Sequence, residues 1–88
     1  MIIAQLKVMP SSPEDDLTKI ESNVTKKLEE LEAKLHKNER QPIAFGLNAL
    51  IFTILWPDKR SLDIVEEEIA KIDNVQSAEI IDARRAVG

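Results

Sequence analysis

The sequence predicts an α+β fold in which two amphipathic helices cover one face of a four-stranded antiparallel sheet. Four segments show the alternating or continuous apolar pattern of strands, and two longer segments carry an apolar residue at every third or fourth position. The segments follow one another in the order βαββαβ. Two long amphipathic helices need a sheet face to cover, which favours this layered arrangement. At 88 residues the chain is expected to form one domain over residues 1–88.

A strand and a long helix are predicted in the first part of the chain. Apolar residues alternate along the first nine positions, and Pro10 ends this strand. Ser12 is expected to cap the helix, with Pro13 in its first turn. Apolar residues then recur at helical spacing, so we expect a helix of about six turns that ends at Lys37 and Asn38. This apolar stripe consists of Leu17, Ile20, Val24, Leu28, Leu31 and Leu35.

The middle of the sequence is predicted to form two strands around a break. A short strand over 40–44 leads to a break or bulge at Phe45-Gly46. The run 47–56 is apolar on both faces, which is typical of a strand in the centre of a sheet. Phe52 and Trp56 in this run are expected to pack in the core, although aromatic residues exposed on a sheet can also stack on RNA bases.

The last part is predicted to form a helix, a strand and a tail. Asp58 or Ser61 caps the helix, the strand covers 75–83, and 84–88 form the tail. The right-handed crossover rule places the first and third strands in the centre, which gives the strand order 4-1-3-2. This is the ferredoxin-like βαββαβ arrangement. The apolar stripe of the second helix consists of Leu62, Val65, Ile69 and Ile72.

The composition argues against most kinds of chemistry. The chain has no cysteine, which excludes disulfides, thiol catalysis and cysteine-based metal sites. Its two glycines, Gly46 and Gly88, cannot form a nucleotide-binding glycine motif. The single histidine, His36, is expected to be a surface group near the end of the first helix. We therefore expect no enzymatic chemistry, no cofactor and no metal.

Charge and hydropathy narrow the class of partner. The net charge of −4 disfavours binding to the phosphates of nucleic acid, which depends on Lys and Arg. An acidic domain can still approach a basic patch on a protein. No run of eighteen apolar residues is present, so we expect no membrane span. The absence of cysteine fits a reducing cytosol, and we expect a cytoplasmic location.

Two places in the sequence stand out as candidate sites. In the segment Pro42–Gly46, a glycine stands at a strand junction, where its backbone freedom has a use. Phe45 either packs inside a bulge or points away from the core, and the pattern alone does not decide between them. Arg84 and Arg85 are adjacent cations near the end of an acidic chain, and form either a solubilising tail or a site.

Three segments resemble translation elongation factor 1-beta, in its C-terminal exchange domain. Residues 42–50, Pro-Ile-Ala-Phe-Gly-Leu-Asn-Ala-Leu, resemble that family's Pro-Ile/Val-Gly/Ala-Phe/Tyr-Gly-Ile/Leu-x-x-Leu segment. Residues 75–80 resemble its closing strand, and residues 7–10, Lys-Val-Met-Pro, resemble its opening strand in archaeal members. The short length, without N-terminal extensions, also resembles the archaeal form.

The resemblance implies a guanine-nucleotide exchange factor, which promotes GDP release and so GTP loading on the GTPase elongation factor 1-alpha. Phe45, between Pro42 and Gly46, matches an aromatic residue that wedges into the nucleotide domain of the GTPase. Arg85, with Arg84 before it, takes the place of a lysine that in eukaryotic members reaches toward the Mg²⁺ and phosphate site. Arginine differs from lysine in shape and in hydrogen bonding, so the contact that this lysine makes in eukaryotic members does not carry over unchanged to Arg85.

The resemblance also implies the partners. The expected partner is elongation factor 1-alpha, with no direct contact to nucleic acid or membrane, and the free chain is expected to be a monomer. Two alternatives are a small-molecule-binding regulatory domain and an RNA-binding domain of the same fold class. The first alternative would need a ligand loop after the first strand, but residues 10–15 have the character of a plain helix-capping segment.

Overall fold

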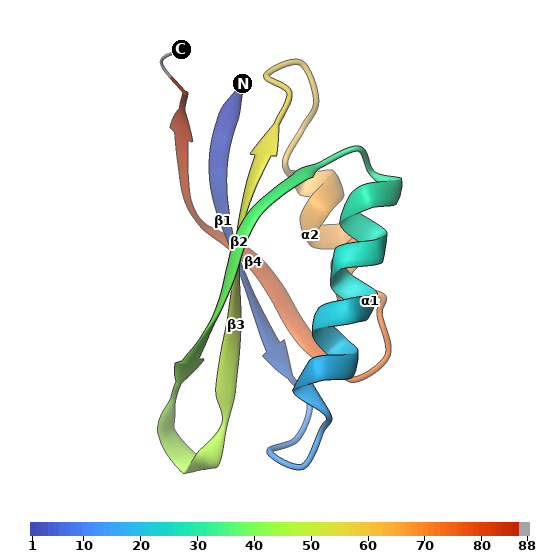
Figure 1. Cartoon of the computed structure of the whole chain (residues 1–88), viewed down its shortest axis with the longest axis vertical. Coiled ribbons are helices and arrows are strands. Elements are labelled where there is room, and N and C mark those ends of the chain that lie inside the picture. Colours follow the sequence, from blue (N-terminus) through green and yellow to red (C-terminus); the bar gives the residue numbers. More distant parts are fainter. Residues whose placement is uncertain (87–88) are drawn as a thin grey trace.

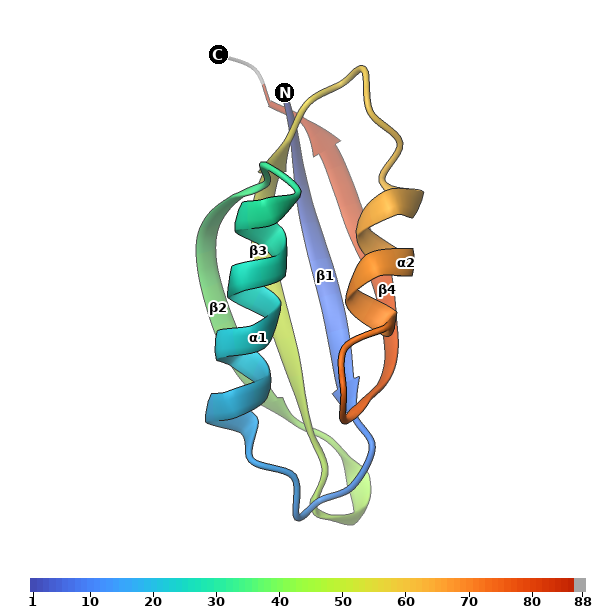
Figure 2. The ribbon, with the colours of Figure 1, turned by 90° about the vertical axis from the view of Figure 1, so that its right-hand side faces the viewer.

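A computed structural model describes residues 1–86 of the chain and shows a βαββαβ arrangement (Figure 1). Both helices lie on one face of a four-stranded sheet, side by side (Figure 2). The strand order is β2-β3-β1-β4, and each neighbouring pair is antiparallel. The predicted ferredoxin-like fold and the order 4-1-3-2, read from the other edge, are therefore confirmed. The elements are β1 (Ile2–Pro10), α1 (Leu17–Glu30), β2 (Lys34–Pro42), a 3₁₀ turn η1 (Ala44–Gly46), β3 (Asn48–Trp56), α2 (Asp63–Ala70) and β4 (Val75–Arg85).

The hydrophobic core lies between the sheet and the two helices. β3 contributes from the centre of the sheet, and Phe52 and Trp56 are completely buried there, as predicted. The helices contribute the middle of each apolar stripe. No helix among residues 1–86 has the length and apolar character that crossing a membrane requires. The core consists of Ala4, Leu6, Val8, Ile20, Val24, Leu28, Ala33, Leu50, Phe52, Ile54, Trp56, Val65 and Ile69.

The predicted end of the first helix is wrong. α1 stops at Glu30, because Glu32 adopts a left-handed conformation with φ of 64°. The N–H of Ala33 donates to the carbonyl of Leu28 at 2.9 Å, and the N–H of Glu32 donates to that of Glu29 at 3.0 Å. These two bonds form a Schellman motif, which satisfies the last carbonyls of the helix without the usual glycine.

The early end of α1 changes the strand that follows. β2 covers Lys34–Pro42 instead of the predicted 40–44, and Leu35 lies in this strand opposite Ile54 of β3. The predicted place of His36 near a helix end is also wrong, because it is an exposed residue of β2. Leu35 still packs against the core. Burial therefore explains its apolar character, as predicted, but it belongs to a strand rather than to the helix.

The predicted cap of α1 is also wrong. Asp16 is the N-cap, and its Oδ1 accepts hydrogen bonds from the N–H groups of Thr18 and Lys19 at 3.0 and 3.3 Å. Ser12 instead begins a tight turn: its N–H donates to Asp15 Oδ2 at 2.8 Å. The helix therefore starts one turn later than the sequence predicts, and Pro13 lies in the preceding loop.

The predicted tail is partly a strand. β4 runs on to Arg85, so Arg84 and Arg85 are paired with Ile3 and Ile2 of β1. The N–H of Ala86 also donates to the carbonyl of Met1 at 2.9 Å. Val87 and Gly88, the rest of the predicted tail, lie outside the described residues.

Candidate partner-binding surfaces

The loop between β2 and β3 is a tight hairpin turn that presents Phe45 at its tip. The N–H of Ile43 donates to the carbonyl of Leu47 at 2.7 Å, and the N–H of Leu47 donates to that of Ala44 at 3.4 Å. Phe45 has φ of 64° and Gly46 has φ of 75°. Positive φ at both central residues is the mark of a type I′ turn, whose twist matches that of the paired strands.

Phe45 is the most exposed large hydrophobic residue among those described, with 93% of its surface accessible. Of the two interpretations of this junction, the one in which Phe45 points away from the core is correct. A left-handed conformation costs an L-residue with a Cβ roughly 1–2 kcal/mol, and asparagine or glycine is preferred in such turns. Neither burial nor backbone preference explains a phenylalanine here.

Gly46 is suited to this turn by its backbone conformation rather than by lack of space. A Cβ added at Gly46 would meet no atom within 4 Å. The positive φ alone favours glycine. Pro42, at the last paired position of β2 opposite Asn48, is exposed and lies at the base of the same loop.

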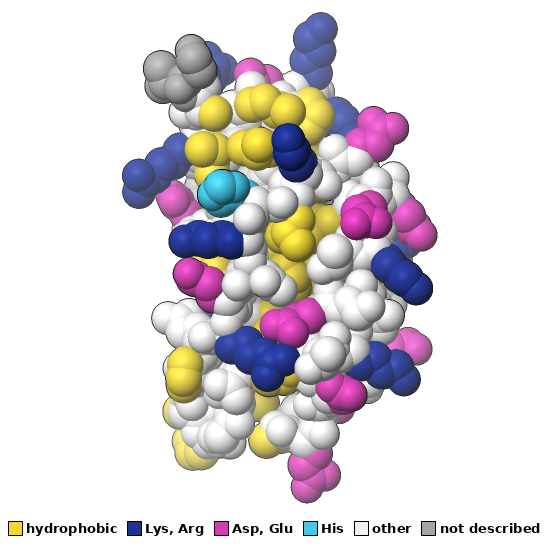
Figure 3. All heavy atoms as spheres, in the orientation of Figure 1, with side chains coloured by type: hydrophobic (Ala, Val, Ile, Leu, Met, Phe, Trp, Pro, Cys, Tyr) yellow, Lys and Arg dark blue, Asp and Glu magenta, His cyan; other side chains and the backbone are white. Residues whose placement is uncertain are grey.

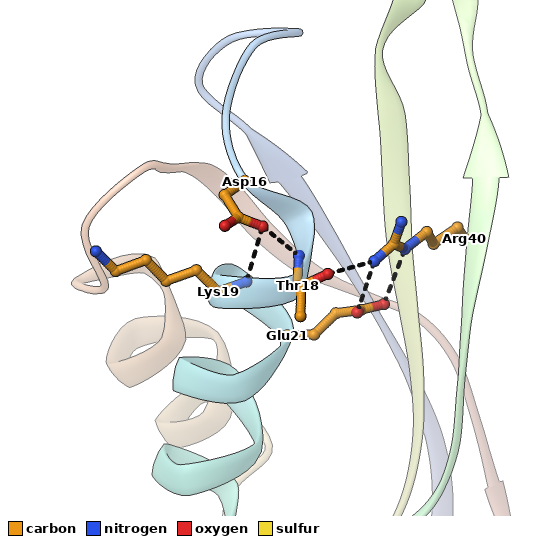
Figure 4. Close-up of polar contacts among 5 residues, drawn as sticks. All are labelled: Asp16, Thr18, Lys19, Glu21 and Arg40. Carbon is orange, nitrogen blue, oxygen red and sulfur yellow. Dashed lines mark hydrogen bonds and ion pairs between the residues drawn. The ribbon is translucent and has the colours of Figure 1, made fainter.

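The hairpin is tied to the first helix near its base (Figure 4). Arg40 of β2 donates from Nε and Nη2 to the two carboxylate oxygens of Glu21 on α1, at 3.2 and 3.0 Å, and from Nη2 to Thr18 Oγ1 at 3.2 Å. The hydrogen bond to Glu21 and the negative charge of Glu21 raise the pKa of Arg40 above the ordinary value of an arginine. Asp16, the cap of α1, adds to the negative charge near this guanidinium.

Arg84 and Arg85 lie at the end of β4 and face opposite sides of the sheet. Side chains alternate along a strand, and Arg85 is in register with Ile2, which packs against the core. Arg85 therefore lies on the helix side and Arg84 on the other side. Arg84 is 77% exposed and its Nε is 3.2 Å from Asp82 Oδ2.

The two candidate sites lie at opposite ends of the molecule. Ile2, in register with Arg85, is also opposite Trp56, whereas the Phe45 loop begins beyond the pair Pro42 and Asn48. Asn48 and Trp56 are eight strand steps apart, which corresponds to about 26 Å. The β2–β3 loop lies at the lower end of Figure 1, and both termini lie at the upper end. The longest dimension of the molecule is 39 Å.

The titratable groups form surface pairs rather than a reactive cluster. Residues 1–86 hold no group of three or more His, Cys, Asp or Glu placed to bind a metal ion. Of the three consecutive glutamates on α2, Glu66 accepts a hydrogen bond from the N–H of Ile80 on β4 at 2.8 Å. Glu68 accepts one from Lys71 Nζ at 2.8 Å. This hydrogen bond lowers the pKa of Glu68 and raises that of Lys71.

A hollow on the helix-free side of the sheet is a feature that the sequence pattern did not predict. It has a volume of about 330 Å³ and lies between β1, β2, β3 and β4 side chains. Its lining comes from strands far apart in the sequence, so no local motif signals it. The residues that line it are Gln5, Glu39, Arg40, Gln41, Pro42, Ile51 and Ile81.

The sequence of this chain is similar to that of a known protein family. The family model described as "EF-1 guanine nucleotide exchange domain" matches residues 3–86. A protein named "Elongation factor 1-beta" from Methanobrevibacter smithii is 40% identical over 85 residues, which is 96% of this chain and 94% of that protein. One of the same name from Pyrococcus abyssi is 43% identical over 81 residues, 90% of this chain and 88% of that protein.

A solved structure shows that the fold also occurs outside this family. The ACT domain from the GTP pyrophosphokinase of Chlorobium tepidum aligns with a TM-score of 0.65 at 10% identity, covering 90% of this chain and 96% of that one. Identity this low shows a common fold and nothing about activity. The family match and the archaeal relatives, in contrast, extend over nearly the whole sequence. The chain therefore belongs to the family of EF-1 guanine nucleotide exchange domains and is a guanine nucleotide exchange factor of translation elongation.

Proposed function

We propose that this chain promotes release of GDP, and so loading of GTP, on elongation factor 1-alpha, and that it does so without covalent chemistry. The observation that carries the proposal is Phe45, a bulky apolar residue held in a left-handed turn with 93% of its surface exposed. Local strain and solvent exposure together are best explained by a contact with another molecule.

The mechanism follows from linkage between two binding equilibria. An exchange factor that binds the nucleotide-free GTPase more tightly than the GDP-bound form weakens GDP binding by the same factor. Each 1.4 kcal/mol of this difference corresponds to about tenfold in affinity. A buried aromatic anchor can supply about 2–4 kcal/mol. Phe45 is therefore large enough to account for a substantial part of exchange.

The two ends of the domain are proposed to contact two separate places on the GTPase. About 26 Å separates the base of the Phe45 hairpin from the row that contains Arg85. In this arrangement Arg85 faces the phosphate and magnesium region, and Phe45 fills an apolar pocket elsewhere. A guanidinium is permanently charged and forms paired hydrogen bonds with phosphate, which suits Arg85 to the anionic end.

Contacts within the domain hold both ends and support this arrangement. Arg85 is held by pairing with Ile2, and the amino group of Met1 lies 3.1 Å from Asp58 Oδ2 in the loop after β3. At the other end, Arg40 and Glu21 fix the base of the hairpin. Contacts presented on a rigid frame lose less entropy on binding than contacts on mobile segments.

The test is release of fluorescent GDP from elongation factor 1-alpha by wild type, Phe45→Ala, Arg85→Ala and a control, Lys26→Ala, on the exposed side of α1. Loss of an anchor worth about 2–4 kcal/mol reduces exchange by about thirtyfold to a thousandfold. Point variants are preferable to a shortened chain, because removing Arg84 and Arg85 would also remove paired residues of β4.

The outcomes separate the activity from the assignment of its residues. If wild type does not accelerate GDP release, the proposed function is wrong. If wild type is active and Phe45→Ala is equally active, the proposed role of Phe45 is wrong. We further propose that the chain is one domain, is a monomer when free, and acts in the cytoplasm, where translation elongation takes place. Sedimentation of the free chain tests its oligomeric state.

A further inference from the structure

The face of the sheet opposite the helices, here called the open face, holds apolar residues that no element of the domain covers. Ile3 of β1 is 40% exposed and Ile81 of β4 is 46% exposed. Both lie outside the core cluster between the sheet and the helices. Scattered exposed apolar residues are ordinary, but apolar residues grouped on one face mark an interaction surface.

At one end of the open face, an apolar pair lies between two cations. The strand register places Arg84, Ile3, Leu55 and Lys34 in one row across β4, β1, β3 and β2. Figure 3 shows hydrophobic side chains grouped at this upper end of the molecule, beside Lys or Arg side chains. A complementary surface would carry apolar side chains flanked by carboxylates.

The hollow lies further along the same face. Ile51, in register with Lys7, is four residues along β1 from the row of Ile3, or about 13 Å. Ile81 and Ile51, which is 7% exposed, supply apolar walls, and Gln5 and Gln41 supply carboxamides that can both donate and accept hydrogen bonds. Glu39 and Arg40 add one charge of each sign at the β2 edge of the hollow. This lining suits an apolar side chain together with the peptide groups of the segment that carries it.

The position of Ile81 depends on a β-bulge that is held from the helix side. Gln5 pairs with Asp82 and Leu6 pairs with Ile80, so Ile81 is the extra residue of β4. Glu66 of α2 accepts a hydrogen bond from the N–H of Ile80 at 2.8 Å. The carboxylate thus fixes the backbone beside the bulge, which turns Ile81 toward the hollow.

The size of the two end sites also favours a third contact. A stable protein complex buries roughly 800 Å² on each partner. A hairpin tip and two arginines fall short of this area. The open face, four strands wide and about 26 Å long, adds on the order of 400–500 Å² at ordinary strand spacing.

We propose that the open face is a third contact surface for the GTPase. In this contact the hollow receives an apolar side chain of the GTPase, and carboxylates of the GTPase meet Lys34 and Arg84 in the row of Ile3. The inference rests on the proposed function. Its grounds are continuity and charge: Pro42 lines the hollow three residues before Phe45, and Arg84 shares the row of Ile3. A partner that contacts both the Phe45 loop and Arg84 along this side of the sheet would cover the open face.

The test compares Ile81→Lys with Ser22→Lys, which adds the same charge at an exposed position of α1 on the helix side. Ile81 is exposed and lies in a bulge, so a lysine can extend into solvent there. We expect the affinity for nucleotide-free elongation factor 1-alpha, measured by titration calorimetry, to fall at least tenfold for Ile81→Lys and to stay within twofold for Ser22→Lys. Ile81→Ser gives a second measurement, with a smaller loss, if the lysine variant has a lower thermal midpoint.

Each outcome decides between the two proposals. If wild type binds and accelerates GDP release while Ile81→Lys and Ile81→Ser bind within twofold of it, the third contact is wrong and the proposed function stands. If wild type neither binds nor accelerates release, both are wrong. If the free chain sediments as a dimer and Ile81→Lys as a monomer, a second copy covers the face and the third contact is overturned.

Discussion

Arg40 of β2 and Glu21 of α1 form a two-point ion pair that links the base of the Phe45 hairpin to the first helix. The two N–O distances are 3.2 and 3.0 Å, and the hydroxyl of Thr18 accepts a further hydrogen bond (Figure 4). Planar pairing of this kind is specific to arginine, because lysine presents a single ammonium group. The pair therefore restrains an edge strand that has few other contacts with the helices.

Replacing Arg40 by lysine is expected to loosen this strand without unfolding the domain. Amide hydrogen exchange should become faster along β2, most clearly at low ionic strength, because salt screens exposed pairs. Lys37→Gln is the control, since Lys37 pairs with Glu39 of the same strand at 3.4 Å and does not reach the helix. Equal exchange rates in wild type and Arg40→Lys would show that the pair does not restrain β2.

Replacing Phe45 by asparagine is expected to separate stability from function. Asparagine tolerates the left-handed conformation that Phe45 adopts at φ of 64°, so the free energy of unfolding should rise by about 0.5–1 kcal/mol. Urea unfolding measures this change. Exchange activity should fall in the same protein, because the exposed aromatic side chain is lost. A less stable Phe45→Asn protein would contradict the account of strain given for this turn.

Gly46→Ala is expected to destabilise the domain through the backbone alone. The added Cβ meets no atom within 4 Å, so steric contact contributes nothing. The positive φ of 75° costs a residue with a Cβ about 1–2 kcal/mol. Thermal or urea unfolding should show this loss, and a smaller one for Gly46→Asn. Equal losses for alanine and asparagine would mean that the φ angle does not determine the preference.

The central strands could be predicted from the sequence because their patterns are strong. The first strand alternates, and the run that forms β3 is apolar on both faces, as its burial shows. β2 gave no comparable signal, since Leu35 is the one residue among its nine that is partly buried rather than exposed. Leu35 also continues the helical spacing of the preceding stripe, so periodicity favoured a longer helix. The stop at Glu32 lacks the glycine that would have marked it.

The candidate sites were only partly accessible from sequence. The resemblance marked Phe45 and Arg85, but it could not place them at opposite ends of the sheet, because that depends on strand register. The hollow depends on a bulge at Ile81 and on side chains from all four strands, none of them adjacent in sequence to Ile81. Both features are non-local, and local patterns do not encode them.

Arg60 is expected to stabilise the end of the molecule that carries Arg85. Its guanidinium carbon lies 4.4 Å from the centre of the Trp56 ring, and its Nη1 donates to the carbonyl of Leu31 at the end of α1. Trp56 Nε1 in turn donates to the carbonyl of Arg60 at 2.9 Å. Arg60→Ala should lower the free energy of unfolding by about 1–2 kcal/mol in urea titrations, through loss of the cation–π contact and of a charged hydrogen bond.

Lys59→Ala is the matched control for Arg60, because Lys59 is the exposed neighbour in the same loop. Its stability should match that of wild type. The stability of Arg60→Lys should lie between that of Arg60→Ala and that of Lys59→Ala. The ammonium group of lysine keeps the charge over the Trp56 ring but loses the planar stacking. Equal stability of Arg60→Ala and Lys59→Ala would show that the contact with Trp56 is energetically neutral.

The pair of Glu68 and Lys71 on α2 is expected to contribute a pH-dependent part of stability. Lys71 donates to Glu68 at 2.8 Å, and Lys27 Nζ of α1 lies 3.9 Å from the same carboxylate. The hydrogen bond from Lys71 lowers the pKa of Glu68 below its ordinary value in the folded chain. The fold therefore favours the carboxylate. This stability is fully present above the ordinary pKa of a glutamate, about 4.3, and is lost as the pH falls through the lower pKa of the folded state.

Glu68→Gln should accordingly be less stable than wild type near neutral pH, by a small amount because both partners reach solvent. The difference in urea midpoint should shrink below about pH 4 and vanish once the carboxylate of the wild type is protonated. Glu29→Gln, at an exposed position of α1, should show no such convergence. A difference between wild type and Glu68→Gln that stayed constant down to about pH 2 would show that the side chain acts through packing rather than through its charge.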